Sequence, residues 1–255
     1  MVRKVALSTF GVWHVGWLIG VLLLLPQVLP AQNFEHHGYT TELTGGIIAH
    51  TNGFGITGKF GSEYKEQIPL VAGLDFLYIR HPKEARIKNP FYDGTTPYVF
   101  GKLNSLFVIR PFIGSHRKLS IRVLPRDVRL RLNYSIGLDL ALLKPVVLGI
   151  VRYNPGGTTY RVEYEQYEPA VHTNQTAIFG TSGFFEGLDD LQLKAGTSLK
   201  AGLEYKIGRD DRMLQLIETG VILDVFVSEI PIFAFGENQR VFPNLFLQFS
   251  IGQRW

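Results

Sequence analysis

Hydrophobic and polar residues alternate along several long segments of this chain. Segment 192–207 is the clearest, because its odd positions are mostly apolar and its even positions take every charge. The same period of two recurs in segments 128–142, 213–227 and 244–255. Successive side chains of a β-strand point to opposite faces, so this period predicts long strands with one apolar and one polar face. A helix would scatter the charges around its circumference.

Eight segments of the chain are predicted to be strands. They are Thr41–His50, Phe54–Gly61, Ile68–Ile79, Tyr98–Pro111, Val128–Val151, Gln192–Ile207, Met213–Val227 and Phe242–Trp255. An even number suits a bacterial barrel with both termini on the periplasmic side. We therefore expect an all-β fold, an up-and-down antiparallel transmembrane β-barrel of about eight strands with long extracellular loops.

The connections between these segments alternate in length. The tight turn at Thr51-Asn52-Gly53 and the longer connections 80–97, 153–191 and 228–241 are expected on one side. Shorter connections, at 62–67, around Gly114–Lys118 and at 208–212, are expected on the other. Short periplasmic turns and long outer loops are typical of an outer-membrane barrel. The break at Lys144-Pro145 suggests a bulge above the bilayer.

The final segment has the pattern of a closing barrel strand. Its apolar face holds five residues: Leu245, Leu247, Phe249, Ile251 and Trp255. Trp255 then falls where an interfacial aromatic girdle lies, and we expect this strand to be read by the barrel-insertion machinery. The alternative architecture is a soluble periplasmic β-sandwich or lipocalin-like barrel, with the apolar faces inward.

The N-terminus resembles an export signal. Arg3 and Lys4 form a basic end, Val5–Leu25 is largely apolar, and Leu29-Pro30-Ala31 precedes Gln32. We expect a signal peptide at 1–31, a periplasmic stretch at 32–40 and the outer-membrane barrel at 41–255, with an uncleaved anchor as the alternative. Removing residues 1–31 lowers the formal charge from +4 to +2, too little to indicate nucleic-acid binding.

Composition excludes several kinds of site. The chain has no cysteine, which rules out a thiolate metal site, a catalytic thiol and a lipidated cysteine. No ordered spacing of oxygen ligands supports calcium at Glu163, Glu165, Asp189 or Asp190, so we expect no metal and no cofactor.

Four segments resemble small outer-membrane β-barrel proteins of the Bacteroidota. They are His81-Pro82-Lys83-Glu84, Tyr98–Ser105, Tyr134-Ser135-Ile136-Gly137 and Phe249–Trp255. The resemblance runs over most of the chain after residue 31. It implies a fold and a location in the outer membrane, and it brings no catalytic or binding motif with it.

The polar parity of the strands predicts a charged lumen. The lumen-facing charges are Asp75, Lys102, Arg110, Arg129, Arg131, Asp139, Lys194, Lys200, Glu204, Lys206, Glu218 and Asp224. An eight-stranded barrel is just wide enough for its own side chains, so this set is expected to form a salt-bridge network that closes the bore. A narrow pore, a proton-linked path or an enclosed ligand site are the alternatives.

The long loops are the expected place for binding. Tyr160–Tyr167 is rich in tyrosine and acids, and its period of two also fits a hairpin above the membrane. Lys83, Arg86 and Lys88 suit lipopolysaccharide phosphates, although a solvated loop explains them equally well. We thus expect outer-membrane lipids and other envelope proteins as partners.

A lipid-modifying enzyme remains an alternative. His50, His81 and His172 are the histidines expected near the outer side, and His116 is expected in a periplasmic turn. The sequence around Ser182 lacks the nucleophile-elbow pattern. A non-catalytic envelope or interaction barrel is the preferred prediction.

Overall fold

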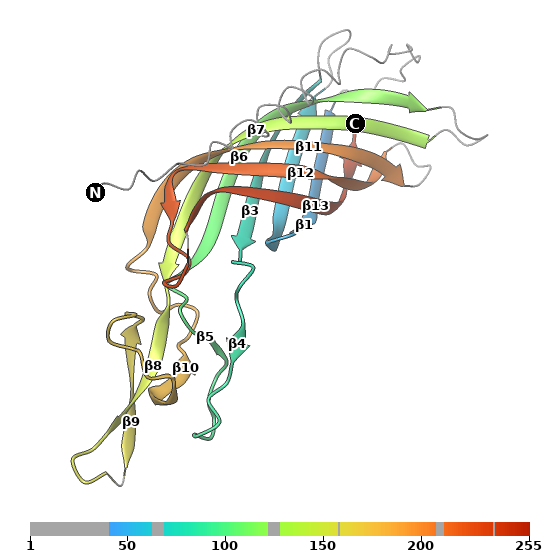
Figure 1. Ribbon diagram of the computed structural model, residues 1–255. Coiled ribbons are helices and arrows are strands. Elements are labelled where there is room, and N and C mark those ends of the chain that lie inside the picture. The colour runs from blue at the N-terminus through green and yellow to red at the C-terminus, as the bar shows by residue number, and fades with distance from the viewer. Residues whose placement is uncertain (1–40, 63–68, 122–127, 158, 208–211, 237) are drawn as a thin grey trace, which may run out of the picture.

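A computed structural model describes residues 41–62, 69–121, 128–157, 159–207, 212–236 and 238–255. Its main body is a closed barrel of eight antiparallel strands (Figure 1). Around the barrel each strand pairs with its neighbours in the chain, and β13 closes on β1. The barrel strands are β1 (Thr41–His50), β2 (Gly53–Ser62), β3 (Leu70–Ile79), β6 (Asn104–Ile121), β7 (Val128–Pro145), β11 (Gln192–Ile207), β12 (Met213–Ile230) and β13 (Gln239–Arg254). The predicted up-and-down barrel of eight strands is confirmed.

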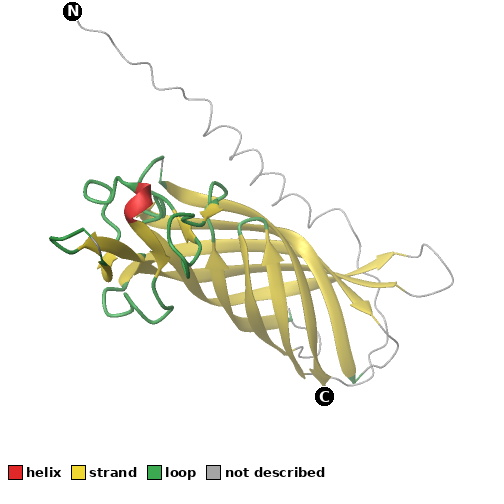
Figure 2. Ribbon diagram, turned by 90° about the horizontal axis from the view of Figure 1, so that it is seen from below, coloured by secondary structure: helices red, strands yellow, loops and turns green. Residues whose placement is uncertain are grey.

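The two ends of the barrel differ. The N–H of Thr41 donates to the carbonyl of Trp255 at 3.0 Å, and the N–H of Trp255 donates back to Thr41 at 3.0 Å. We call this the terminal end, and six strand ends lie there: Ser62, Leu70, Ile121, Val128, Ile207 and Met213. The opposite end, the loop end, carries the connections 80–103, 146–191 and 231–238. Figure 2 shows the loops gathered at one end and the C-terminus at the other.

Two strand predictions were right to the residue, and the turn around Gly114–Lys118 was wrong. β1 and β11 have the predicted bounds, whereas β6 continues through Gly114 and His116 to Ile121. A Cβ on Gly114 would lie 2.4 Å from the carbonyl oxygen of Tyr134 on β7. This glycine therefore permits a close approach between strands instead of forming a turn.

Two other predicted strands are divided. Within Tyr98–Pro111, Tyr98 and Val99 form β5 (Tyr98–Val99), which pairs with β4 (Arg86–Ile87), and the barrel strand starts only at Asn104. Within Val128–Val151, β7 ends at Pro145, and β8 (Val147–Tyr153) belongs to a separate sheet. Proline has no N–H for the ladder, which suits the point where the chain leaves the barrel.

The side chains of the barrel are arranged inside out compared with a soluble protein. Large apolar residues on the outer face are open to the surroundings, including Ile47 at 65%, Leu138 at 69% and Leu245 at 64% exposure. The inner face holds charged and amide side chains with almost no exposure, such as Arg110 at 1% and Gln248 at 1%. The alternation of the sequence thus places the apolar face outward, opposite to a lipocalin-like barrel.

The loop-end connections fold into a small module. β8, β9 (Tyr160–Gln166) and β10 (Ile178–Thr181) form a sheet in the order β10-β8-β9, beside the 3-10 helix η2 (Gln175–Ala177). Buried apolar residues form the core of this module: Tyr98, Val146, Leu148, Ile150, Tyr167 and Ile178. The expected hairpin of alternating residues at Tyr160–Tyr164 is present as β8 and β9.

The predicted signal peptide and periplasmic stretch, 1–40, lie outside the described residues. Among the residues that are described, no helix has the length and apolar character to cross a membrane.

Candidate functional site

Arg110 is buried inside the barrel among three aspartates. Its Nε donates to Oδ1 of Asp139 at 2.6 Å, and its Nη2 donates to Oδ1 of Asp224 at 2.5 Å. The third carboxylate, Oδ2 of Asp75, lies 3.7 Å from Nη1. All four side chains are buried and come from the four strands β3, β6, β7 and β12. We call these residues the Arg110 cluster; with every group ionised it carries two more negative than positive charges.

Neutral polar groups surround this cluster. Thr57 Oγ1 donates to Oδ1 of Asp75 at 2.6 Å, and Asn244 Nδ2 donates to Oδ2 of Asp224 at 3.4 Å. The ring of His50 is 3.3 Å from Asn244 Oδ1 through Nδ1. Because a buried charge is costly unless it is paired and hydrogen-bonded, these contacts help the barrel to hold its carboxylates away from water.

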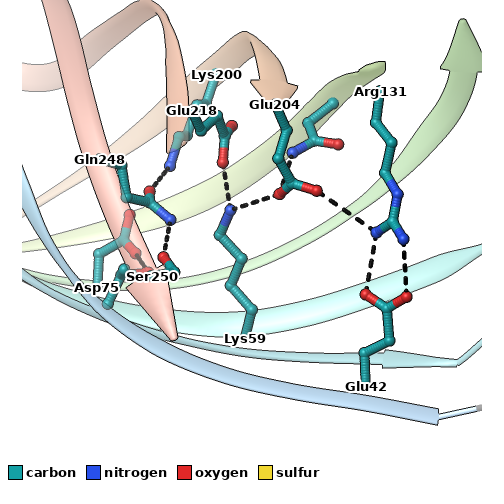
Figure 3. A network of polar contacts seen from close by, with 11 residues as sticks. Glu42, Lys59, Asp75, Arg131, Lys200, Glu204, Glu218, Gln248 and Ser250 are labelled. Carbon is teal, nitrogen blue, oxygen red and sulfur yellow. Dashed lines mark hydrogen bonds and ion pairs between the residues drawn. The ribbon is translucent and has the colours of Figure 1, made fainter. Parts of the chain in front are cut away.

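A second group of charges lies between the Arg110 cluster and the terminal end, because Lys59 lies nearer that end of β2 and Glu218 nearer that end of β12. Figure 3 shows this group beside Asp75. Lys59 of β2 forms a short ion pair with Glu218 and lies 3.9 Å from Glu204. Lys200 donates to Oε1 of Gln248 at 2.7 Å and lies 4.5 Å from the centre of the Phe246 ring. Each buried lysine is thus held by partners on other strands of the barrel.

A third group continues this chain of ion pairs to the terminal end. Arg131 donates to both carboxylate oxygens of Glu42, at 2.9 and 3.0 Å, and to Glu204 at 3.4 Å (Figure 3). Arg254 bonds the same Glu42 from the neighbouring strand. Bases and acids therefore alternate from Arg254 to Glu218 and join six strands.

A cavity lies beside these two groups. The cavity is small, about 50 Å³, and its walls include Glu42, Lys59, Arg131, Glu204 and Glu218. The interior of the barrel is therefore polar and partly hollow in its terminal half.

The loop-end half of the interior is filled by apolar side chains. Inward positions of β1, β3, β6, β7, β12 and β13 contribute to a cluster in which every residue is nearly fully buried. Its members are Ile48, Leu77, Ile79, Leu106, Val108, Ala141, Leu143, Ile222, Phe226, Ile230, Ile232, Phe242 and Phe246. Phe226 and Phe242 meet edge to face at 5.8 Å between ring centres. We call this group the apolar closure; the alternation of the sequence does not predict it.

The structure separates the twelve predicted lumen charges. It brings seven of them into the contacts above: Asp75, Arg110, Arg131, Asp139, Glu204, Glu218 and Asp224. Lys200 joins them through Gln248. Lys102 lies in the loop-end connection and not on a barrel strand, where it pairs with Glu84 at 2.9 Å and bonds the Tyr78 hydroxyl at 3.1 Å.

Three predicted charges lie near the ends of their strands. Lys194 donates to the backbone carbonyl of Glu229 at the loop end. Lys206 is half-buried near the terminal end of β11, and Arg129 follows the first residue of β7. The lumen prediction overlooked Glu42 and Lys59. Glu42 precedes the exposed Leu43 in β1, and Lys59 precedes the exposed Phe60 in β2. Both therefore lie on the inward face by strict alternation, which predicts them.

The histidines expected near the outer side each contact neighbouring polar groups. His50 is bonded to Asn244, and His81 accepts from the N–H of Lys83. His172 accepts from the N–H of Glu168 and lies 3.4 Å from Glu165. His116 lies inside β6 and not in the periplasmic turn that was predicted. Within the described ranges, no group of three or more histidines or acids could hold a metal ion.

Tyrosines gather on the loop-end module. The Tyr92 and Tyr153 hydroxyls are 2.9 Å apart, and the Tyr160 ring lies 5.1 Å from that of Tyr92. The hydrogen bond with Tyr153, together with some burial, raises the pKa of Tyr92 to about 12. This cluster ties the 88–95 loop to the hairpin tip.

The opposite side of the hairpin carries charges. Arg152 pairs with Glu163 and with Glu165, each at 2.5 Å, and Arg161 pairs with Glu163 at 2.6 Å. The hydrogen bond from Arg152 lowers the pKa of Glu165. The module therefore presents an aromatic side and a charged side.

The chain matches no family model and no curated protein. Among solved structures it is similar to Neisserial surface protein A (NspA), with 10% identity, a TM-score of 0.37, and coverage of 86% of this chain and 98% of that one. It is also similar to Ail, the attachment invasion locus protein of Yersinia pestis, with 10% identity, a TM-score of 0.37, and coverage of 86% and 100%. The resemblance to Bacteroidota proteins stays a prediction.

Proposed function

We propose that this protein is a non-catalytic barrel of the bacterial outer membrane that acts as a binding partner through its loop-end module. The observation that carries the proposal is the inside-out barrel, with apolar residues such as Leu138 outward and the Arg110 cluster inward. Apolar surface facing water is unfavourable, and a contiguous exposed apolar patch marks contact with protein or lipid. A strand of about 9–11 residues crosses a bilayer, and β1, β2 and β3 have 10 residues each.

The interior supports a structural role over transport. The apolar closure fills the loop-end half of the bore, and the Arg110 cluster and the ion-pair chain cross the rest of it beside the small cavity. An ion entering from the loop end would have to leave water and pass side chains with no polar group, which is costly. We infer that the charges hold the strands together and that the barrel conducts no ions.

The loop-end module supports the binding role. It has its own apolar core, so its shape does not depend on a ligand. Exposed aromatic residues, including Phe185 at 80% and Tyr164 at 56%, are the type enriched at protein interfaces. Lys83, Arg86 and Lys88 are exposed at the same end, where phosphates of lipopolysaccharide would lie.

The location is tested by fractionation and by gel mobility without boiling. A closed barrel has each strand bonded to two neighbours, so it should resist detergent until heated. We expect recovery in the outer-membrane fraction and a mobility change on boiling. In planar bilayers the purified protein should show no steady conductance. Recovery as a soluble periplasmic protein would overturn the location, and stable channels would overturn the closed bore.

The binding role is tested by excising the module. The N–H of Ser182 donates to the carbonyl of Val147 at 3.1 Å, so residues 148–181 can be replaced by a short Gly-Ser linker without moving the flanking chain. Intact membranes with the wild type or this variant are cross-linked, and co-purifying proteins and lipids are identified by mass spectrometry. Companions lost in the variant, while its heat-dependent mobility is retained, support the proposal. Identical companions for both proteins contradict it.

A further inference from the structure

The sheet of the loop-end module has one covered edge and one open edge. At the β10 edge, Thr96 Oγ1 donates to the carbonyl of Thr181 at 2.9 Å, and Thr181 Oγ1 donates to that of Pro97 at 3.2 Å. A Cβ on Gly180 would lie 2.2 Å from Thr96 Oγ1, so this edge is packed closely. At the other edge, no strand of the described residues pairs with β9 on the side away from β8.

The hydrogen bonds at both ends of the hairpin show which backbone groups point outward. The carbonyl of Thr159 accepts from Asn154 at 3.0 Å, and the N–H of Tyr167 donates to Val146 at 2.8 Å. Odd-numbered groups of β9 therefore point toward the first arm of the hairpin. Because the direction alternates along a strand, the N–H and C=O of Tyr160, Val162 and Tyr164 point to the open edge.

The side chains of β9 are complementary to themselves when a second copy runs antiparallel. In a pairing centred on Val162, Tyr160 of each copy lies opposite Tyr164 of the other. On the opposite face each Arg161 lies across from a Glu163. Shifting the centre to Glu163 would set two like charges against each other, which is destabilising.

We infer that the open edge of β9 binds β9 of a second copy of this chain in an antiparallel, two-fold symmetric pairing centred on Val162. The inference rests on the proposed function, because it names the partner of the loop-end module. Three residue pairs would each exchange two backbone hydrogen bonds: Val162 with Val162, Tyr160 with Tyr164, and Tyr164 with Tyr160. Arg161 and Glu163 of both copies would form a ring of alternating charge that selects this register.

The position of the hairpin sets where the second copy lies. Figure 1 shows β8 and β9 projecting away from the barrel with the hairpin tip farthest from it. Antiparallel pairing reverses the direction of the second hairpin, so the two barrels lie at opposite ends of the joined sheet. The two copies then belong to facing membranes, and the contact joins membrane surfaces.

The charges on β9 also disfavour random aggregation at this edge. Exposed edge strands invite pairing with any chain, and charged residues are a common protection against it. The edge carries Arg161, Glu163 and Glu165, so a register that sets like charges opposite one another is penalised. The same charges that disfavour other partners favour pairing with β9 of a second copy in the register centred on Val162.

The test uses nanodiscs that hold one barrel each, so that pairing can occur only between discs. Two populations carry donor and acceptor dyes, and energy transfer is measured up to about 0.1 mM, a range that detects weak complexes. Empty discs control for contact through lipid. We expect concentration-dependent transfer for the wild type. The absence of transfer over this range overturns the inference.

Two sets of variants test the register. Val162→Pro removes the central outward N–H, which an edge strand tolerates, and should weaken pairing by at least about tenfold, while Val162→Thr keeps the N–H and should pair normally. Arg161→Glu and Glu163→Arg should each fail to pair with themselves but should pair when mixed. Pairing that survives Val162→Pro, or a mixture that stays apart, overturns the register.

Single cysteines give a direct readout because the chain has none of its own. Val162→Cys should cross-link two copies through a short thiol reagent, whereas Tyr160→Cys should not, since its counterpart would be displaced by four residues, about 13 Å. Module-dependent companions other than this protein, without disc pairing, would leave the proposed function standing and overturn the self-association. Recovery from the soluble fraction would instead overturn the proposed function.

Discussion

Replacing Arg110 by leucine should test whether the ionic interior stabilises the barrel. The side chain is 1% exposed and contacts three carboxylates, so the variant leaves the cluster with three unpaired acids. Removing one partner of a buried ion pair typically costs about 3–5 kcal/mol. The formal charge of the cluster falls from −2 to −3, and folding would require one more carboxyl proton than in the wild type.

The cost of that proton gives an independent magnitude. Protonating an aspartate of ordinary pKa, about 3.9, costs roughly 4 kcal/mol at pH 7 and roughly 1.5 kcal/mol at pH 5. The variant binds the extra proton only when folded, so its unfolding free energy rises relative to wild type as pH falls. We therefore expect a deficit of about 4 kcal/mol at pH 7 that shrinks by about 2.7 kcal/mol at pH 5.

The assay is urea unfolding of the barrel in detergent micelles, followed by the heat-dependent mobility change and by tryptophan fluorescence. Arg110→Leu combined with Asp139→Asn restores the formal charge to −2 and should recover most of the loss. Lys194→Leu is the matched control, since its amine bonds only a backbone carbonyl at the barrel end among the described contacts. A deficit below about 1 kcal/mol, or one that does not change with pH, would refute the reasoning.

Three further changes test other parts of the structure. Leu138→Arg, at an outward position with 69% exposure, should destabilise the barrel in lipid by about 2–4 kcal/mol, while Leu138→Val should not; equal stability in vesicles would contradict a lipid-facing surface. Trp255→Asp should reduce outer-membrane levels and increase periplasmic degradation, whereas Trp255→Phe should insert nearly normally, and equal levels by immunoblot would show that the girdle role is wrong. Tyr153→Phe should lower the pKa of Tyr92 from about 12 toward its ordinary value. Because the pKa of Tyr92 is raised, the wild-type contact is present below pH 10 and is lost as the pH passes about 12. A tyrosine absorbance titration that is the same for the variant and the wild type would contradict that contact.

The alternation of apolar and polar residues predicted the barrel well, because each strand has one face outside the barrel and one face inside it. It gave the bounds of β1 and β11 and the inward parity of Arg110 and Glu218. It could not predict the apolar closure, because Leu106 and Leu143 lie in stretches where both faces are apolar, and parity then carries no information.

Composition is a poor guide where a small residue serves packing. Gly114 has the composition of a turn, but it lies in β6 against β7. Lys102 matches the inward parity of an extended strand, yet the chain bends before Asn104 and takes Lys102 to the loop end. The partners of the ion-pair chain, such as Glu42 with Arg131, depend on how eight strands stagger around the barrel. That stagger is not encoded in any single segment.

The closure of β13 on β1 has a consequence for folding kinetics. Glu42 and Arg254 bond each other across 212 positions of the chain. Contacts between distant positions are slow to form, because the entropy of closing a long loop is lost before the contact is made. Until that last seam joins, the sheet has two unpaired edges and its inner charges lack partners from the missing side. Assembly is therefore expected to end in one late, cooperative step. A chain that is delayed before this step depends on a chaperone to avoid aggregation and proteolysis.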